Sequence, residues 1–338
     1  MNVSGASDLA RLTMLQTRAI NVRDALDRAA TELTTGEKNS KYEATGGNLT
    51  RLFALERSLD RNKVFSETVS LTELRLDIMQ EGLGQILKPA ENLAIDIVTS
   101  TNLGDIAATR IHASTSRAAF EDAVGVLNGT VAGQSLYAGT TTDRPALAPA
   151  ADILAQLDAL AAAAPDAAAA VAAIDDYFDG GSGSVPNFFG DGYVGSPDDL
   201  NAVEIGEGRR LDYSIRADQA ELVAVMRGHA MAAVVAGGAF AGDSANQMAL
   251  MAEAGSSLLA AKEGVLDLRA RVGGSQFAVE QARAERISER DTLGLARAKI
   301  VAVDPLEAAS AYQQLQVQLE SVFTVTSRLA NLRFSNFM

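Results

Sequence analysis

The sequence predicts a mainly α-helical protein, and three observations lead to this fold class. Both ends of the 338-residue chain repeat apolar residues at alternating spacings of three and four, which places them on one stripe of a helix. Spans of helical character, separated by short turns, fill most of the chain between the ends. Hydrophobic residues make up 47% of the composition, which is enough apolar material for a buried core.

The first predicted helix covers residues 12–33 and carries a coiled-coil rhythm. It closes at Thr34-Thr35-Gly36, because glycine readily adopts the left-handed conformation that ends a helix. Charged residues such as Arg18, Arg23 and Arg28 fall off the apolar stripe. The N-terminal stripe, or seam, consists of Leu12, Leu15, Ala19, Val22, Leu26, Ala29 and Leu33.

The last predicted helix repeats this pattern. Asp304-Pro305-Leu306-Glu307 is typical of a helix start, with an N-cap, a first-turn proline and a glutamate that can reach back to the cap. Since Ala and Thr bury little area, both seams favour helices that become ordered when neighbours pack on them, although pairing inside one globular helical domain is an equal alternative. The C-terminal seam consists of Ala308, Tyr312, Leu315, Leu319, Val322, Thr326 and Leu329.

Further helices are predicted between the two ends. Residues 49–100 form one of them, with a kink or break at Pro89. Others cover 105–129 and 218–235, and a long one is interrupted at Gly273-Gly274. The apolar face of the first is predicted at Leu52, Leu59, Leu71, Leu74 and Ile78, and the interrupted helix covers 247–270 and 276–300.

Residues 143–215 differ from their surroundings. They hold 13 acidic residues against 3 basic ones and five of the seven prolines. Two Ala-rich helices, at 152–164 and 166–178, precede two short strands, at 202–205 and 211–215. We interpret this segment as an inserted acidic surface lobe. The expected domains are a terminal coiled-coil domain of 1–35 plus 304–338, a helical rod domain of 36–142 plus 216–303, and the lobe.

Several function classes are disfavoured. A net charge of −14 argues against a nucleic-acid binder and against docking on an anionic membrane. The absence of cysteine excludes disulfides and thiolate chemistry, and His112 and His229 have no partner at metal-site or triad spacing. Gly190–Gly195 matches G-x-G-x-x-G but lacks the flanking strand and helix of a dinucleotide site. We therefore expect no enzyme, no cofactor and no bound metal.

Neither a membrane span nor a cleavable signal peptide is expected. The longest uncharged apolar stretch, near 230–242, contains three glycines and is shorter than the ~18 residues that indicate a transmembrane helix. The first ten residues lack the basic start and apolar run of a signal peptide.

One segment carries a family resemblance. Gly133-Gln134-Ser135-Leu136-Tyr137-Ala138-Gly139-Thr140-Thr141-Thr142-Asp143-Arg144-Pro145 resembles the G-x-Y-L-F-G-G-T-x-T-x-x-P stretch of the hook–filament junction proteins, or hook-associated protein 3, in the flagellin-like family of the bacterial flagellum. Arg271-Val272-Gly273, 304–308 and 332–338 are similar to the C-terminal part of that family. The motif positions are Gly133, Leu136, Tyr137, Gly139, Thr140 and Pro145.

The resemblance implies an elongated flagellin-like helical rod of N- and C-terminal helices with a small inserted α/β lobe. It also implies a structural subunit of the extracellular flagellum, exported by the type III apparatus without a cleavable signal peptide, that forms the junction layer between hook and filament. The implied partners are copies of the chain in a ring-like layer, the hook-side junction protein, flagellin, and an export chaperone on the C-terminal helix. Within this reading, the two seams are the assembly interface. Ala44-Thr45-Gly46-Gly47 stands where flagellin-like proteins often carry Asp-Asp-Pro.

Two alternatives remain open. Flagellin itself shares the terminal helices but would lack the segment at 137–140. A coiled-coil adaptor outside the flagellum would need no inserted acidic lobe, and its seams would be stable in the monomer.

Overall fold

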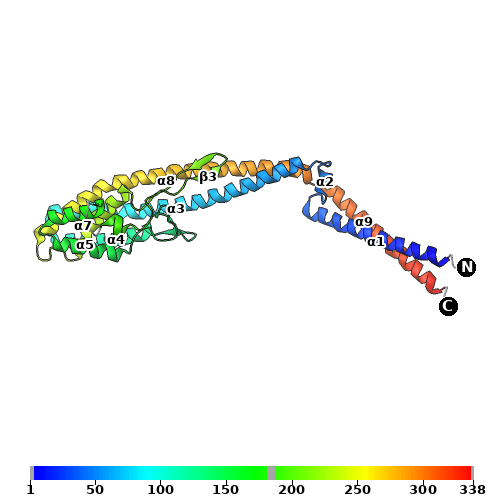
Figure 1. Cartoon of the computed structure of the whole chain (residues 1–338), viewed down its shortest axis with the longest axis horizontal. Coiled ribbons are helices and arrows are strands. Elements are labelled where there is room, and N and C mark those ends of the chain that lie inside the picture. Colours follow the sequence, from blue (N-terminus) through cyan, green and yellow to red (C-terminus); the bar gives the residue numbers. More distant parts are fainter. Residues whose placement is uncertain (1–3, 181–186, 336–338) are drawn as a thin grey trace. The chain divides into compact units, whose positions relative to one another are not determined.

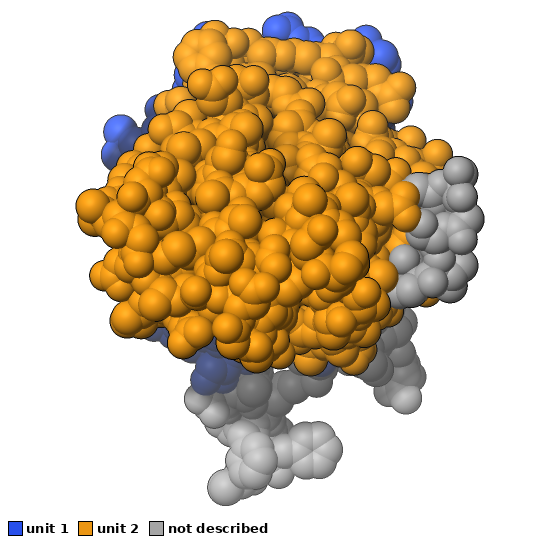
Figure 2. All heavy atoms as spheres, turned by 90° about the vertical axis from the view of Figure 1, so that its left-hand side faces the viewer, with its two compact units in different colours: residues 1–64, 287–338 blue, residues 65–286 orange. Residues whose placement is uncertain are grey.

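Helices account for 76% of the structure, a computed structural model that describes residues 4–180 and 187–335, and this confirms the mainly α fold class. The chain divides into two compact units (Figure 2): unit 1 contains residues 1–64 and 287–338, and unit 2 contains residues 65–286. The elements are α1 (Ser4–Thr35), α2 (Lys41–Ala44), α3 (Thr50–Leu103), α4 (Ile106–Leu127), β1 (Thr130–Val131), β2 (Gln134–Ser135), α5 (Ala150–Ala163), α6 (Ala167–Asp179), the π-helical turn η1 (Phe188–Gly192), β3 (Val203–Gly206), β4 (Arg209–Leu211), α7 (Ala220–Ala236), α8 (Ser244–Val301) and α9 (Pro305–Ser335).

In unit 1, the first and last helices of the chain, α1 and α9, pack side by side (Figure 1). The predicted helix ends are confirmed. Helix α1 stops at Thr35, and Gly36 follows it with a φ of +70°. Helix α9 begins at Pro305, and the carboxylate of Asp304 accepts a hydrogen bond from the Leu306 N–H at 2.8 Å. The sequence signals at both termini therefore act as true caps.

Neither long helix is broken, so the predicted interruption at Gly273-Gly274 is wrong, and of the kink or break predicted at Pro89 the break is wrong. Helix α3 continues through Pro89, and α8 continues through Gly273 and Gly274. A proline removes one helical hydrogen bond, and a glycine costs about 1 kcal/mol relative to alanine, so neither ends a helix whose neighbouring turns are held by packing. Ala90 and Val272, which are next to these residues, are both buried.

The predicted apolar face of α3 is wrong over its second part. Leu71, Leu74 and Ile78 are 43%, 49% and 40% exposed. The buried residues belong to a different stripe of the same helix, which includes Val69, Leu76, Met79 and Leu83. Both stripes follow the helical period, so spacing alone does not choose between them.

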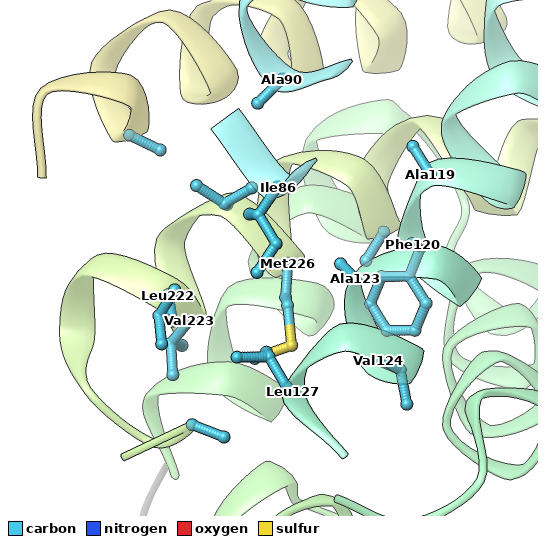
Figure 3. Packing of buried hydrophobic residues seen from close by; sticks show 14 of the residues in the cluster. Ile86, Ala90, Ala119, Phe120, Ala123, Val124, Leu127, Leu222, Val223 and Met226 are labelled. Carbon is cyan, nitrogen blue, oxygen red and sulfur yellow. The ribbon is translucent and has the colours of Figure 1, made fainter. Parts of the chain in front are cut away.

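A single buried cluster forms the core of unit 2. Helix α4 packs against α7, and Phe120 and Leu127 of α4 meet Met226 of α7 and Ile86 of α3 (Figure 3). Helix α7 is apolar on nearly every side, and twelve of its residues are buried, as expected for a helix surrounded by others.

The segment expected to form a separate lobe contributes to this same cluster. Helices α5 and α6 pack on each other and on α7. Their buried side chains include Leu154, Leu157, Ile174 and Phe178, and Leu147 lies just before α5 in the same cluster. Residues 143–215 therefore share one apolar core with the flanking helices.

Two antiparallel hairpins complete unit 2. Strands β3 and β4 pair with Val203 opposite Leu211 and turn at Gly208, which has a φ of +67°, close to the predicted position. Strands β1 and β2 form a hairpin that the sequence analysis did not predict. Its two turn residues, Ala132 and Gly133, have φ values of +51° and +77°, and two consecutive positive φ values are characteristic of a type I′ turn.

Candidate assembly interface

The α1/α9 pair brings the two predicted seams together, but it covers them only in part. Val22 and Ala29 on α1 and Ala308 and Val322 on α9 are more than nine-tenths buried. Leu33 is 40% exposed. Leu15, Ala19 and Leu26 on α1 and Tyr312, Leu315, Leu319 and Thr326 on α9 are half-buried, while the side chains of Leu12 and Leu329 lie outside the described residues.

Large apolar side chains off the seam are left open to solvent. On α1, Met14 is 69% exposed and Ile20 is 60% exposed. On α9, the exposed fractions are 63% for Val317 and 58% for Phe323, and Leu306 at the start of the helix reaches 80%. Exposed apolar side chains on a helix pair can become contacts when further helices pack on it. The pair therefore offers apolar surface on more than one side.

The family-like segment at 133–145 is buried at its centre, at Tyr137, Ala138 and Gly139, and exposed at its two ends. Tyr137 is 1% exposed, and its hydroxyl lies 3.5 Å from the Met79 carbonyl of α3. Burial raises the pKa of the Tyr137 hydroxyl well above its usual value. The Tyr137 carbonyl accepts a hydrogen bond from the Ala217 N–H at 2.9 Å, so this residue connects α3 to the chain entering α7.

The remaining motif positions fix the backbone around Tyr137. Gly133 lies in the β1–β2 turn, and Leu136 is half-buried against the core. Thr140 donates its N–H to the Asp198 carbonyl at 3.2 Å and bonds through its hydroxyl to Ser196 at 2.8 Å. Pro145 is exposed, and the buried Ala146 follows it. The motif thus ties the segment after β2 to residues 196–198.

Gly139 is the most constrained residue of the motif. Its φ is +62°, and a Cβ atom at this position would lie 2.7 Å from the Ser196 carbonyl oxygen and closer still to that of Asp198. Both carbonyl oxygens already accept a hydrogen bond: that of Ser196 from the Tyr193 hydroxyl at 2.7 Å, and that of Asp198 from the Thr140 N–H. Only glycine fits here without moving the main chain.

The residues weighed for other chemistry are not brought together. His229 is buried in α7, and burial lowers its pKa to about 4, whereas His112 lies half-buried on α4. Residues 188–192 form the π-helical turn η1, which overlaps the start of the G-x-G-x-x-G match. Across the described residues, no group of three or more His, Asp or Glu side chains is placed to hold a metal ion. No described helix is long and apolar enough to cross a membrane.

Comparison with known proteins identifies similarity at the level of the fold. No protein-family model matches the chain, and no curated protein sequence matches it at a significant level. The chain is similar to a solved structure from Vibrio parahaemolyticus that carries a provisional assignment as a flagellar hook-associated protein. The TM-score is 0.50 at 13% sequence identity, and the match covers 73% of this chain and 94% of the other. At this identity, the comparison supports a common fold.

Proposed function

We propose that this chain is a structural subunit of the bacterial flagellum that forms the junction layer between hook and filament, and that it is not an enzyme. The exposed apolar side chains of the α1/α9 pair carry this proposal, because they require covering by neighbours in an assembly. The motif at 133–145 and the fold shared with the Vibrio parahaemolyticus protein favour a flagellar role over other assemblies.

The proposed partners follow from the same reading. Copies of the chain pack through α1 and α9 into a ring-like layer, with the seam residues at the contacts. One side of this layer meets the hook-side junction protein, and the other accepts the first flagellin subunits. Before export, a chaperone covers α9, since an apolar helix is a common docking element for a binding groove. The assembled protein lies outside the cell.

Localisation of a tagged copy tests the proposal directly. An epitope tag inserted in the region 181–186, within unit 2, should label a narrow band at the distal end of the hook on isolated flagella. Removing the chain from the cell should give hooks without filaments, together with unpolymerised flagellin in the medium. Label along the filament would instead identify the chain as flagellin. Normal filaments in the strain that lacks the chain would refute the junction role.

A matched pair of substitutions tests the assembly interface. Leu319→Asp places a carboxylate on the half-buried seam of α9, and Gln318→Asp places the same charge on the exposed side of the same helix. Burying an unpaired carboxylate between subunits costs several kcal/mol, so Leu319→Asp should give hooks without filaments. Gln318→Asp should leave filaments intact. Normal filaments with Leu319→Asp would show that this seam is not an assembly contact.

A further inference from the structure

Two links of the chain meet at one place in unit 1, which we call the joint: residues 36–49 connect α1 to α3, and residues 302–304 connect α8 to α9. The links pair through a single bridge between Glu37 and Ala302. The Lys38 N–H donates to the Val301 carbonyl at 2.8 Å, and the Val303 N–H donates to the Gly36 carbonyl at 3.0 Å. These backbone bonds hold the end of α1 beside the start of α9.

Four charged side chains surround this crossing, and we call them the charge ring: Glu37, Lys41, Glu56 and Arg297. Arg297 binds Glu37 through both ends of its guanidinium group, with Nη2 at 2.9 Å from Oε2. Arg297 Nε lies 3.8 Å from Glu56 Oε1, and the same oxygen is 2.9 Å from Lys41 Nζ. The hydrogen bond from Arg297 holds the pKa of Glu37 below its usual value. Opposite charges therefore alternate around the ring.

Apolar packing at the joint is limited to its edges, where Leu52, Val301 and Ala308 are 0%, 1% and 1% exposed. Helix α2 has no buried residue, and Tyr42 within it is 63% exposed. A cavity of about 260 Å³ opens between the end of α1, the link and the start of α9. Three carboxylates, from Glu32, Glu43 and Glu307, line it beside the ammonium of Lys38, and the ring residues do not line it. The ring and the crossing bonds therefore add polar contacts between the two links to the apolar packing at the edges of the joint.

We propose that the charge ring is an ionic latch that controls whether the α1/α9 pair is ordered. When the latch is closed, the two helices start side by side and can pair locally. When it opens, the two short links on either side of the crossing lose the ring and are held by their backbone bonds, by the apolar packing at the edges and by the contact of α3 with α8 at Asn62 and Glu289, so the ends of α1 and α9 can move apart more easily. The seam is weak, with only four residues more than nine-tenths buried among those described, so opening the latch lets α1 and α9 fray. This inference does not rest on the proposed flagellar function.

Hydrogen–deuterium exchange on the purified full-length chain tests the latch. Arg297→Met removes the central cation of the ring and keeps most of the side chain's length. Arg290→Met is the matched control, because Arg290 is one heptad earlier on α8 in an exposed pair with Asp291, where the side chains are 62% and 60% exposed. We expect peptides from residues 13–35 and 305–328 to exchange about fivefold faster with Arg297→Met than with Arg290→Met. Peptides from α4 and α7 should not change.

Salt separates an ionic latch from lost packing. At 1 M NaCl the screening length falls to about 3 Å, so α1 and α9 of the unmodified chain should exchange as fast as those of Arg297→Met. The exchange of Arg297→Met itself should respond less to salt, because only the Lys41–Glu56 pair of the ring remains in that variant. Glu37→Gln, a smaller change, should accelerate the same peptides. Equal exchange in the Arg297→Met and Arg290→Met variants, or the same salt response with and without Arg297, would overturn the proposal.

Discussion

Replacing Gly139 by alanine should destabilise unit 2 far more than the same change at Gly133. Both glycines have positive φ values, +62° and +77°, so each substitution carries the left-handed penalty of about 1–2 kcal/mol. At Gly133 no atom beyond the neighbouring residues lies within 4 Å of the new Cβ, so the loss of folding free energy should be limited to this backbone penalty. At Gly139 the new atom collides with the carbonyls of Ser196 and Asp198, which must shift and lose hydrogen bonds. We expect a total loss of about 3–5 kcal/mol.

Urea unfolding followed by tyrosine fluorescence measures this difference. The chain has no tryptophan, and four of its 6 tyrosines, Tyr137, Tyr177, Tyr193 and Tyr213, belong to unit 2, so the signal reports mainly on that unit. Gly139→Ala should lower the transition midpoint clearly below that of Gly133→Ala, with similar slopes. Equal midpoints for the two variants would refute the reasoning. They would show that the carbonyls at 196 and 198 can move without any loss of folding stability.

Two further predictions concern the core of unit 2. The pKa of His229 is about 4 in the folded state and about 6.5 when unfolded, so the unfolded chain binds more protons between these values and stability falls as pH decreases from 6.5 to 4. The free energy of unfolding should decrease by about 3 kcal/mol over this range, and His229→Leu should remove this pH dependence. If the unfolding free energies of the two proteins change with pH in parallel, the prediction is wrong. Replacing residues 144–211 with a Gly/Ser linker should expose the shared core, because Leu154, Leu157 and Phe178 are part of it. The shortened chain should then bind a hydrophobic dye or aggregate, whereas a well-folded helical remainder would show that the segment is an independent lobe.

The sequence predicted those features that depend on local chemistry. Gly36 and Asp304 mark helix ends because the left-handed cap and the carboxylate cap each act within one turn. The β3–β4 turn was found from its glycines for the same reason. Failures occurred where tertiary packing decided the result. Pro89 stays inside α3 because its neighbours are buried on unit 2 helices that lie far away in the sequence.

For the two seams of the candidate interface, too, the sequence predicted the local pattern but not the packing. Periodicity identified which residues of α1 and α9 form the stripes, since a spacing of three and four fixes a face of a helix. It did not indicate how completely two helices would cover those stripes, nor that Met14, Ile20 and Val317 would stay open on other faces. The charge ring was also beyond sequence reasoning, because Glu37 and Arg297 are 260 positions apart and meet only where the chain crosses itself.

The family-like motif and the assembly surface have separate physical roles, and this separation has a consequence for function. The centre of the motif lies in the interior of unit 2, where Tyr137 and Gly139 join α3, the segment at 196–198 and the entry to α7. The exposed apolar residues of the proposed assembly surface, such as Met14, Ile20 and Val317, lie on α1 and α9 of unit 1, and unit 2 also exposes apolar side chains such as Leu103 and Phe277. A substitution in the motif should therefore reduce the amount of folded protein without changing how the folded molecules assemble, whereas a seam substitution such as Leu319→Asp should leave a folded unit 2 that fails to assemble. Comparing the unfolding of unit 2 with filament formation in the same variants distinguishes the two effects.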